Sequence, residues 1–396
     1  MAHAADIVVV GGGLVGALAA LGIAQAGRQV MLVDRNRPQR QRGELGIDVR
    51  NIAVSPASRQ LLDQVGVWSA LRAAPYSGMQ VWEERGTRSM SFLANEVGRQ
   101  ELGWILESSE VVCALWDVLA AMDNVVLVTG AEFEDVSTSQ SGALLRTTEG
   151  EISCRLLIAA DGARSRVRQA LDVATDESDT GHHALATVVR TERGHGGVAY
   201  QRFLIEGPLA LLPSTDAHLS SVVWSQPPEQ AERRAAIGTE EFCADIERCL
   251  EARLGKVQAV DQRFVFPLRQ MLVQSFNPDP RVLLIGDAAR VLHPLAGLGA
   301  NIGFEDVRDL LEDLTAMPGS QDPGVAQLWR KFARQRRARS QIMLSLMTGF
   351  RRVYAASDPL SQWLRNTGVD WLNQAGILKS QLMKEALGLG PVAQRW

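Results

Sequence analysis

The chain of 396 residues is long enough for two or three structural units. Its composition, 46% hydrophobic and 22% charged, is ordinary for a globular protein, and a net charge of -4 gives no sign of a nucleic-acid binder. The four cysteines form no C-x-x-C pair and the six histidines show no metal-ligand spacing, so we expect reduced thiols, no metal site and a cytoplasmic location.

Residues 6–34 predict a strand, a helix and a second strand around a glycine-rich turn. A short apolar run is followed by an Ala-rich helical stretch and a second apolar run that ends at Asp34. The glycines after the first run have the G-x-G-x-x-G spacing: Gly11, Gly13 and Gly16. In such a unit the glycines allow a tight turn, approach to a pyrophosphate and close helix packing, while the acid accepts hydrogen bonds from a ribose.

Two other interpretations of this stretch are weaker. Residues 7–27 carry no charge and are long enough to span a bilayer, but the clustered glycines between a β-branched and an Ala-rich run are typical of a turn. A secretory signal is not expected, because residues 1–6 contain Asp6 and no basic residue.

Helices and strands alternate through the next part of the chain. Ser55 and Pro56 are a typical helix start, for a helix that runs to residue 66. Alternating residues predict strands within 79–93, a helix follows over 109–122, and further strands are expected within 125–158. The last of these strands leads into Asp161 and Gly162, a second turn at the carboxyl end of a strand.

Beyond residue 184 the pattern becomes mainly β. Strand-like runs fill 186–224, and one helix is expected over 239–254. A buried run at 282–285 then enters Gly286 and Asp287, and a helix follows over 300–314. Residues 325–390 are predicted to be helical.

These elements predict an α/β fold: a Rossmann-like dinucleotide-binding domain with an inserted antiparallel-sheet substrate domain and a helical C-terminus. We expect the dinucleotide-binding domain to comprise residues 1–75, 106–182 and 270–325. The substrate domain, a mixed β-sheet, is expected to comprise 76–105 and 183–269. The C-terminal helical region is expected over 326–396.

Three strands are thus predicted to end in a ligand-type turn, at Gly11, at Asp161 and at Gly286. A single strand-ending Asp is more often a helix cap than a ligand. Three in one chain favour one extended dinucleotide cofactor held at several points, because ligands of open α/β sheets bind at the carboxyl ends of the strands.

The three motifs resemble the fingerprints of the class A flavoprotein aromatic hydroxylases, which have the p-hydroxybenzoate hydroxylase fold and bind FAD. Finer features resemble the ubiquinone-biosynthesis hydroxylases within that class, over nearly the whole chain. They are residues 102–107, 199–204, 207–213 and 293–297.

The resemblance implies roles for individual residues. Asp34 would bind the adenosine ribose with Arg35 beside it, Arg50 would reach the phosphates or ribityl chain, and Asp287 would bind the ribityl chain. Asp161 and Gly162 would lie near the pyrophosphate. The backbone of 297–301 would face the flavin pyrimidine, where the helix dipole favours negative charge. The implied cofactor-binding residues are Gly11, Gly13, Gly16, Asp34, Arg35, Arg50, Asp161, Gly162, Gly286, Asp287, Gly297, Gly299, Ala300 and Asn301.

The chain departs from the family at three positions. Leu298 stands where the family commonly has Gln, Arg290 where it usually has His, and Val112 where a Gln is often found. These departures affect side-chain contacts to the flavin and leave backbone contacts intact.

The implied activity is that of an FAD-dependent monooxygenase that uses O2, with NAD(P)H as transient electron donor, to hydroxylate the ring of a polyprenylated phenol or quinol in ubiquinone biosynthesis. Alternatives are hydroxylation of a small soluble aromatic compound, or a flavin oxidoreductase without oxygen insertion. The sequence identifies no catalytic residue; His293, Tyr200 and Pro294 are the candidates for positions near the ring.

The implied partners are the polyprenylated substrate, O2 and a ubiquinone-biosynthesis complex, and no nucleic acid. A basic stretch from residue 323 to 357, with interleaved apolar residues, indicates either peripheral contact with the inner face of the membrane or a helix packed on the FAD-binding domain. The sequence does not fix the ring position, the prenyl chain length, the choice between NADH and NADPH, or the oligomeric state.

Overall fold

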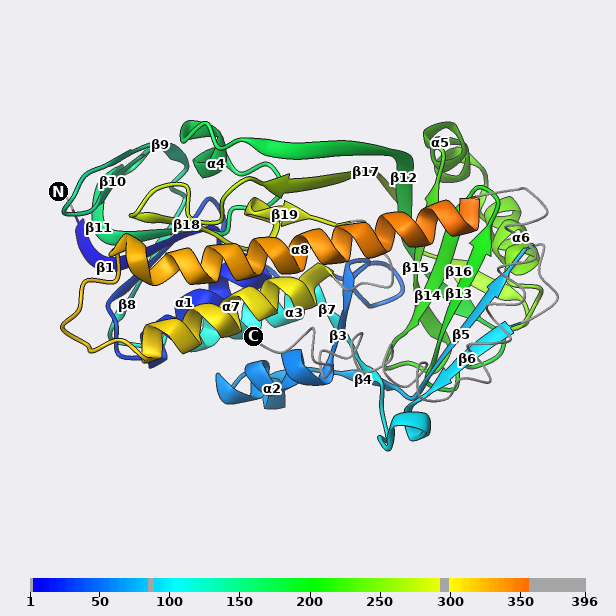
Figure 1. Cartoon of the computed structure of the whole chain (residues 1–396). Helices are drawn as coiled ribbons and strands as arrows, with labels where there is room; N and C mark the ends of the chain where they lie inside the picture. Colours follow the sequence, from blue (N-terminus) through cyan, green and yellow to red (C-terminus); the bar gives the residue numbers. More distant parts are fainter. Residues whose placement is uncertain (1–2, 85–88, 293–298, 356–396) are drawn as a thin grey trace.

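The computed structural model describes residues 3–84, 89–292 and 299–355. Two β-rich halves lie side by side, and the long helix α8 (Ala326–Ala355) runs along both of them (Figure 1). The fold is the predicted α/β arrangement with a helical C-terminal region; the part of that region beyond residue 355 lies outside the described residues.

The first half is built on a sheet with the strand order β8-β2-β1-β11-β10-β9, with β18 beside β11. Strands β8, β2, β1, β11 and β18 are parallel, whereas β9 and β10 form antiparallel pairs. The strands are β1 (His3–Val10), β2 (Val30–Asp34), β8 (Val125–Thr129), β9 (Phe133–Thr138), β10 (Ala143–Thr147), β11 (Gly150–Ala159) and β18 (Val282–Leu284).

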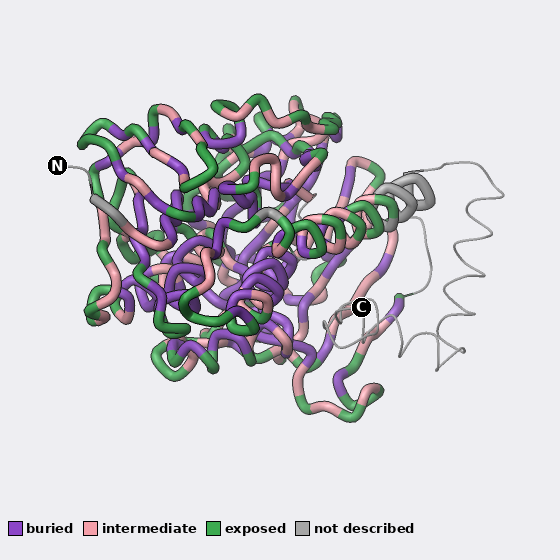
Figure 2. The backbone as a smooth tube through the Cα atoms, turned by 60° about the vertical axis from the view of Figure 1, so that its left-hand side comes forward, coloured by how far each residue is buried: buried purple, intermediate pink, exposed green. Residues whose placement is uncertain are grey.

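Helices cover this sheet because its strands are apolar on both faces. α1 is buried on nearly every side between the sheet, α3 and α7, which explains why its sequence is apolar all round (Figure 2). The helical elements of this half are α1 (Leu14–Gln25), α2 (Pro56–Gln64), η1 (Trp68–Ala70), α3 (Ser108–Leu119), α4 (Arg166–Ala170), η3 (Gly286–Ala288) and α7 (Gly299–Thr315).

The second half is a sheet with the order β19-β17-β12-β15-β14-β13-β5-β6, with β16 beside β12. Its pairs are antiparallel as predicted, except that β5 and β13 are parallel. The strands are β5 (Gly78–Glu83), β6 (Ser89–Leu93), β12 (Thr175–Thr191), β13 (Val198–Leu204), β14 (Gly207–Pro213), β15 (Leu219–Gln226), β16 (Val257–Val260), β17 (Phe264–Val273) and β19 (Arg290–Val291).

On the outer face of this second sheet lie α5 (Pro228–Ala236) and α6 (Thr239–Cys249), where the sequence predicted one helix. α5 was missed, although Pro at its first positions is a helix-start signal. The short element η2 (Ala94–Val97) follows β6.

Two features join the halves. A small sheet of β3 (Asn51–Val54), β7 (Gly103–Glu107) and β4 (Ala74–Tyr76) lies between them. The long strands β12 and β17 pair along most of their length and extend from one half into the other. The predicted domain boundaries at 182/183 and 269/270 lie inside these two strands and stay a prediction.

Helix α8 contains most of the basic stretch of residues 323–357. Its aromatic residues Trp329 and Phe332 are fully buried against the core of the first half, and Trp329 Nε1 donates to the Pro323 carbonyl at 2.6 Å. Arg336 is also buried, at 3% exposure. The apolar side of this stretch therefore packs on the protein, and Arg336 is not available to a membrane. Among the described helices, none is both long and apolar enough to cross a bilayer.

We predict that Trp329→Ala lowers the free energy of unfolding by about 3–5 kcal/mol, the usual cost of emptying a buried aromatic site. Urea denaturation of the protein measures this loss. The neighbouring exposed position provides the control, since Arg330→Ala should change stability by no more than about 0.5 kcal/mol. Equal midpoints for Trp329→Ala and the wild type would contradict the docking of α8.

Candidate FAD site at the carboxyl edge of the parallel strands

The parallel strands of the first sheet end in register. Val10 lies directly between Val33 of β2 and Ala159 of β11, and Ala159 is next to Leu284 of β18. The pairing continues one residue further, because Gly11 N donates to Val33 O at 2.8 Å and Ala160 N donates to Val10 O at 2.8 Å. The turns that follow β1, β11 and β18 are therefore adjacent in space.

The three glycines of the first turn have different tasks. Gly11 has φ +101°, and a Cβ there would lie 2.4 Å from the Ala160 carbonyl oxygen; a Cβ on Gly16 would lie 1.9 Å from Gly11 O. Both glycines thus make the close approach of turn, strand and helix possible. A Cβ on Gly13, in contrast, would meet no described atom within 4 Å, so Gly13 faces open space.

Gly13 is also the N-cap of α1, and in the described structure no side chain caps this helix end. Its first turn carries no acidic residue. The free backbone N–H groups and the positive end of the helix dipole are therefore left for an anion, as in sites that bind pyrophosphate.

Asp34, at the end of β2, fixes the glycine turn. Its Oδ2 accepts a hydrogen bond from Gly12 N at 2.6 Å and its Oδ1 accepts one from Asn36 N at 2.9 Å. Trp116 of α3 holds the same turn, because its Nε1 donates to Gly12 O at 2.8 Å. A carboxylate has about four acceptor sites, so Asp34 retains capacity for ribose hydroxyls.

Asp161 accepts hydrogen bonds from the first backbone N–H groups of the short helix α4, and one of its oxygens has no partner among the described residues. Its Oδ2 accepts hydrogen bonds from Arg166 N at 2.7 Å and Val167 N at 3.2 Å. Its Oδ1 is buried and has no hydrogen-bond partner among the described residues. Burial raises the pKa of Asp161, an effect that the hydrogen bonds from Ser165 and the backbone oppose. A buried unpaired carboxylate oxygen calls for a further donor.

Asp287 projects from the third turn. Gly286 has φ +59°, the left-handed conformation that glycine adopts freely, and it carries Asp287 at the start of η3. Burial raises the pKa of Asp287 and the charge of Arg290 lowers it, yet the side chain keeps exposed surface. Because the side chain is exposed, its carboxylate is accessible as a hydrogen-bond acceptor for a ligand.

The first turn of α7 lies beside these turns. Gly299 is exposed and Ala300 is half-buried, whereas the Asn301 side chain is buried. Its Oδ1 accepts from Ser55 N at 2.9 Å and its Nδ2 donates to Ala53 O at 2.7 Å. Both ends of this buried amide are therefore engaged by the β3–α2 segment, which fixes the position of the first turn of α7. Gly297, His293 and Pro294 lie outside the described residues.

The remaining predicted residues lie further out. Arg35 is exposed, and its carbonyl accepts a hydrogen bond from Gly130 N. Arg50 is exposed, and its Nη2 donates to Gln41 Oε1 at 2.9 Å. Gly162 follows Asp161 with φ +83°.

Tyr200 is not placed to touch a ring held at this edge. It packs edge-on against Trp82, with ring centroids 6.4 Å apart, in the cluster under α6 on the outer face of the second sheet. Its strand neighbour Ala199 points the other way, toward Ala53 and Ile105. Adjacent strand residues face opposite sides of a sheet, and the sequence alone did not show which face of β13 is the inner one.

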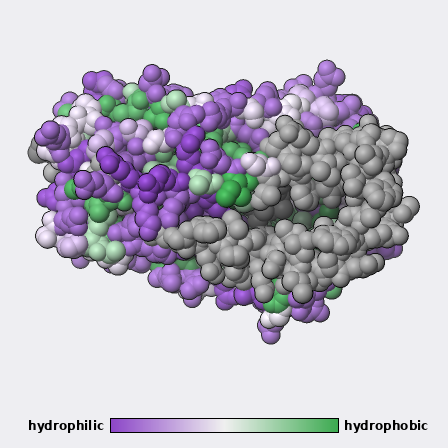
Figure 3. Space-filling view, in the orientation of Figure 1, coloured by the Kyte–Doolittle hydropathy of each residue, from purple (hydrophilic) through white to green (hydrophobic). Residues whose placement is uncertain are grey.

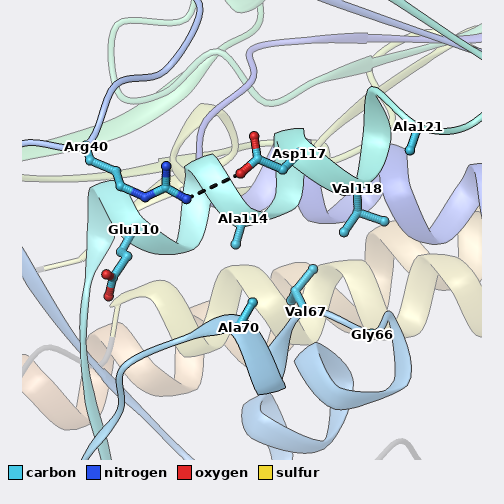
Figure 4. A pocket seen from close by; sticks show the side chains of 9 residues that line it. All are labelled: Arg40, Gly66, Val67, Ala70, Glu110, Ala114, Asp117, Val118 and Ala121. Carbon is cyan, nitrogen blue, oxygen red and sulfur yellow. Dashed lines mark hydrogen bonds and ion pairs between the residues drawn. The ribbon is translucent and has the colours of Figure 1, made fainter.

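A shallow pocket elsewhere does not belong to this site. It has a volume of about 380 Å³ and lies between α3 and the segment from Gly66 to Ala70 (Figure 4). An ion pair between Arg40 and Asp117 crosses its rim, and the described residues that line it include none from the three turns.

Comparison with known proteins identifies the family of the chain. Residues 4–345 match the FAD binding domain family. The chain belongs to this family. It is 33% identical to 3-demethoxyubiquinol 3-hydroxylase of Escherichia coli, over 97% of this chain and 98% of that protein. It is 30% identical to ubiquinone hydroxylase UbiL of Rhodospirillum rubrum, over 99% of this chain and 92% of that protein.

Solved structures agree on the fold. p-Nitrophenol 4-monooxygenase PnpA from Pseudomonas putida superimposes with a TM-score of 0.78 at 20% identity, covering 99% of this chain and 100% of that chain. HpxO of Klebsiella pneumoniae, solved with FAD and uric acid, gives a TM-score of 0.71 at 18% identity, covering 98% of both chains. The predictions of an FAD-dependent hydroxylase family, of the α/β fold and of FAD as cofactor are confirmed.

The described residues suit FAD at this edge. The open space at Gly13 and the uncapped α1 suit a pyrophosphate, and the unpaired Asp161 Oδ1 and the accessible Asp287 suit hydroxyl or water donors. That these particular residues bind FAD stays a prediction.

Sequence reasoning missed two helix side chains that hold these turns. Trp116 of α3 donates to the Gly12 carbonyl, and Asp306 of α7 accepts a hydrogen bond from Gly286 N. For Asp306 the available signal was an acid amid the apolar residues of α7.

We predict that substitutions at Gly13 and at Gly16 affect different properties, FAD binding at Gly13 and stability at Gly16. Gly13→Glu abolishes FAD binding, because the side chain and its charge occupy the pyrophosphate path. Gly13→Ala keeps the stability of the apoprotein within about 1 kcal/mol and still weakens FAD binding. Gly16→Ala, the matched control, destabilises the apoprotein by about 1–3 kcal/mol through its clash with Gly11 O.

Urea unfolding of the apoprotein and titration with FAD measure these two quantities separately. Unchanged FAD affinity in Gly13→Glu would contradict the placement of a pyrophosphate at α1.

Proposed function

We propose that this protein uses FAD and O2 to hydroxylate the aromatic ring of a polyprenylated phenol or quinol in ubiquinone biosynthesis. The observation that carries the proposal is the 33% identity, over 97% of this chain and 98% of the relative, to 3-demethoxyubiquinol 3-hydroxylase of Escherichia coli. Bound FAD supplies the redox chemistry that activates O2, with reducing equivalents from NAD(P)H, as is typical of the family.

The residues of the carboxyl edge would hold the cofactor. The N-terminus of α1 binds the pyrophosphate, Asp34 accepts hydrogen bonds from the adenosine ribose, and Asp287 accepts hydrogen bonds from the ribityl chain. Asp161 contacts the pyrophosphate through water. Arg35 and Arg50 add positive charge at the adenine end and near the phosphates.

The N-terminus of α7 would act on the flavin ring. The backbone N–H groups of Gly299 to Asn301 belong to the first turn of this helix, where the dipole is positive. Asn301 ties that turn to β3 and α2, so the N–H groups are held in place before any ligand binds. A preorganised positive end stabilises negative charge on a reduced ring without reorganisation.

The inner face of the second sheet would receive the substrate ring. Ala199 and Leu212 on this face pack toward β3 and β7. The next row of the same face consists of Gln201, Ala210 and Val223, which are direct cross-strand neighbours. Small apolar side chains with one buried amide suit an aromatic ring that carries few polar groups, and Gln201 is the polar group placed to orient a ring hydroxyl.

Labelled oxygen tests the proposed reaction. Purified protein, reduced with NADPH or NADH under 18-O2, should place one labelled oxygen atom in the ring of a ubiquinone precursor. Label recovered only in water, or an unlabelled product, would favour a flavin oxidoreductase without oxygen insertion. Labelling of a small soluble aromatic compound with no reaction of prenylated precursors would favour the other alternative.

We also propose peripheral contact with an anionic membrane, and association with a ubiquinone-biosynthesis complex, because a polyprenyl tail resides in lipid. Trp329 packs on the protein and Arg336 is buried. Among the residues of α8 whose burial the structure describes, the exposed basic ones are Arg330, Lys331 and Arg334. The described surface along this part of α8 is hydrophilic (Figure 3), so the contact is electrostatic. Each basic residue near an anionic surface contributes on the order of 1 kcal/mol.

Flotation with liposomes tests the membrane contact. Arg330→Glu, Lys331→Glu and Arg334→Glu combined should reduce binding to anionic vesicles, and high salt should reduce binding of the wild type. A matched control reverses the same number of exposed charges elsewhere, with Arg146→Glu, Arg155→Glu and Arg269→Glu. Equal binding of both variants would contradict a contact through α8.

A further inference from the structure

One buried carboxylate connects the third turn to the C-terminal helix. Asp306 of α7 has 0% exposure. Its Oδ2 accepts from Gly286 N at 2.9 Å, both of its oxygens accept from Arg290 Nη1 at 2.7 and 3.0 Å, and its Oδ1 accepts from Arg336 Nε at 2.5 Å. Asp306 therefore holds the turn, the strand β19 and helix α8 together.

Arg336 is the most heavily engaged member of this group. Its Nη1 lies 3.3 Å from Glu305 Oε2 and 3.2 Å from Asp309 Oδ2, and its Nη2 donates to the Ile302 carbonyl at 3.0 Å. Burial alone would lower the pKa of Arg336, but the surrounding carboxylates outweigh burial and raise it. The guanidinium thus stays charged and its fork is fully occupied.

The cluster contains charges of both signs. Glu305, Asp306 and Asp309 face Arg290, Arg308, Arg336 and Arg339; Arg339 Nε lies 3.5 Å from Glu305 Oε2, and Arg308 Nη2 lies 3.1 Å from Asp309 Oδ1. Burying so many charges contributes little to stability compared with apolar packing, because desolvation opposes the attraction. Such a cluster does, however, fix the relative geometry of the elements that supply it, since each charge has one arrangement in which all partners are satisfied.

The geometry that this cluster fixes is that of the Gly286–Asp287 turn. Gly286 donates its N–H to Asp306 and accepts the Ala289 N–H at 3.1 Å, so its backbone is held on both sides. Asp287 is the next residue, and its side chain is exposed. The same Arg290 that pairs with Asp306 also lowers the pKa of Asp287, against the raising effect of burial.

We propose that Arg290 and Arg336 are positioning residues for FAD: they hold Asp306, which fixes the turn that presents Asp287 to the cofactor. Helix α8 is then a part of the FAD site, although it contributes no residue to the three turns. The inference rests on the proposed placement of FAD beside Asp287.

The chain offers a matched control in a second buried arginine. Arg281 precedes β18, whereas Gly286 follows it, so the two lie at opposite ends of the same strand. Arg281 is 6% exposed, and its Nη1 donates to both oxygens of Asp322 at 2.8 Å. It joins the sheet to the segment before α8 without touching the turns.

The test compares Arg336→Lys with Arg281→Lys, each prepared as the apoprotein and then titrated with FAD. Each variant keeps its charge and loses the planar fork. Urea unfolding measures stability, quenching of flavin fluorescence measures the Kd for FAD, and visible circular dichroism reports the surroundings of bound flavin. We expect Arg336→Lys to raise the Kd on the order of tenfold, the size usual when a group that orients a ligand-binding residue is removed, and to change the dichroism. Arg281→Lys should leave both at wild-type values.

A double-mutant cycle shows whether Arg336 acts through the turn. In an Asp287→Ala background, Arg336→Lys should weaken FAD binding little further, because the contact that it positions is already gone. If Arg336→Lys does not fold, Arg336→Met combined with Asp309→Asn removes one charge of each sign and serves in its place, with the same expectations.

Equal loss of FAD affinity in Arg336→Lys and Arg281→Lys would overturn the inference and leave the cluster a purely structural role. So would effects of Arg336→Lys and Asp287→Ala that simply add. An unchanged Kd in Asp287→Ala alone would overturn the placement of FAD beside Asp287, and the inference with it, which distinguishes this failure from the other two.

Discussion

The structure depends on the parallel alignment of β2, β1, β11 and β18, whose last paired residues form one row across the sheet. Parallel strands deliver the chain to the same edge each time, so residues far apart in the sequence meet there. The glycine turn, Asp161 and Asp287 come together for this reason. A shift of one strand by a single residue would separate them and would turn every side chain of that strand to the opposite face.

The site is preorganised by residues that never need to touch a ligand. Trp116 holds Gly12, Asn301 joins α7 to the start of α2, and Asp306 holds Gly286. Each uses a side chain from a helix to fix the backbone of a turn. This is an economical solution for a cofactor with several separate polar groups, because the turns are shaped before the cofactor arrives and little ordering entropy remains to be lost on binding.

The sequence predicted the features that depend on local pattern. An apolar run followed by Gly or Asp is visible in one dimension, so the ends of β1, β11 and β18 and the fold class were all accessible. The face on which Tyr200 lies was not, because only the pairing of β13 with its neighbours and the position of α6 decide which side of the sheet is inner. The burial of Arg336 was not accessible for a related reason: a basic residue on a helix is normally solvated, and nothing in its own segment reveals the three acids of α7 opposite it.

Hydrogen–deuterium exchange of the apoprotein and the FAD-loaded protein tests most directly whether one cofactor is held at all three turns. If one cofactor is held at all three turns, FAD should slow exchange of the backbone amides at residues 11–16, 161–167 and 286–288. The amides in the first turn of α7 should be slowed as well. Protection confined to residues 11–16, with no change at the turns after β11 and β18, would contradict it.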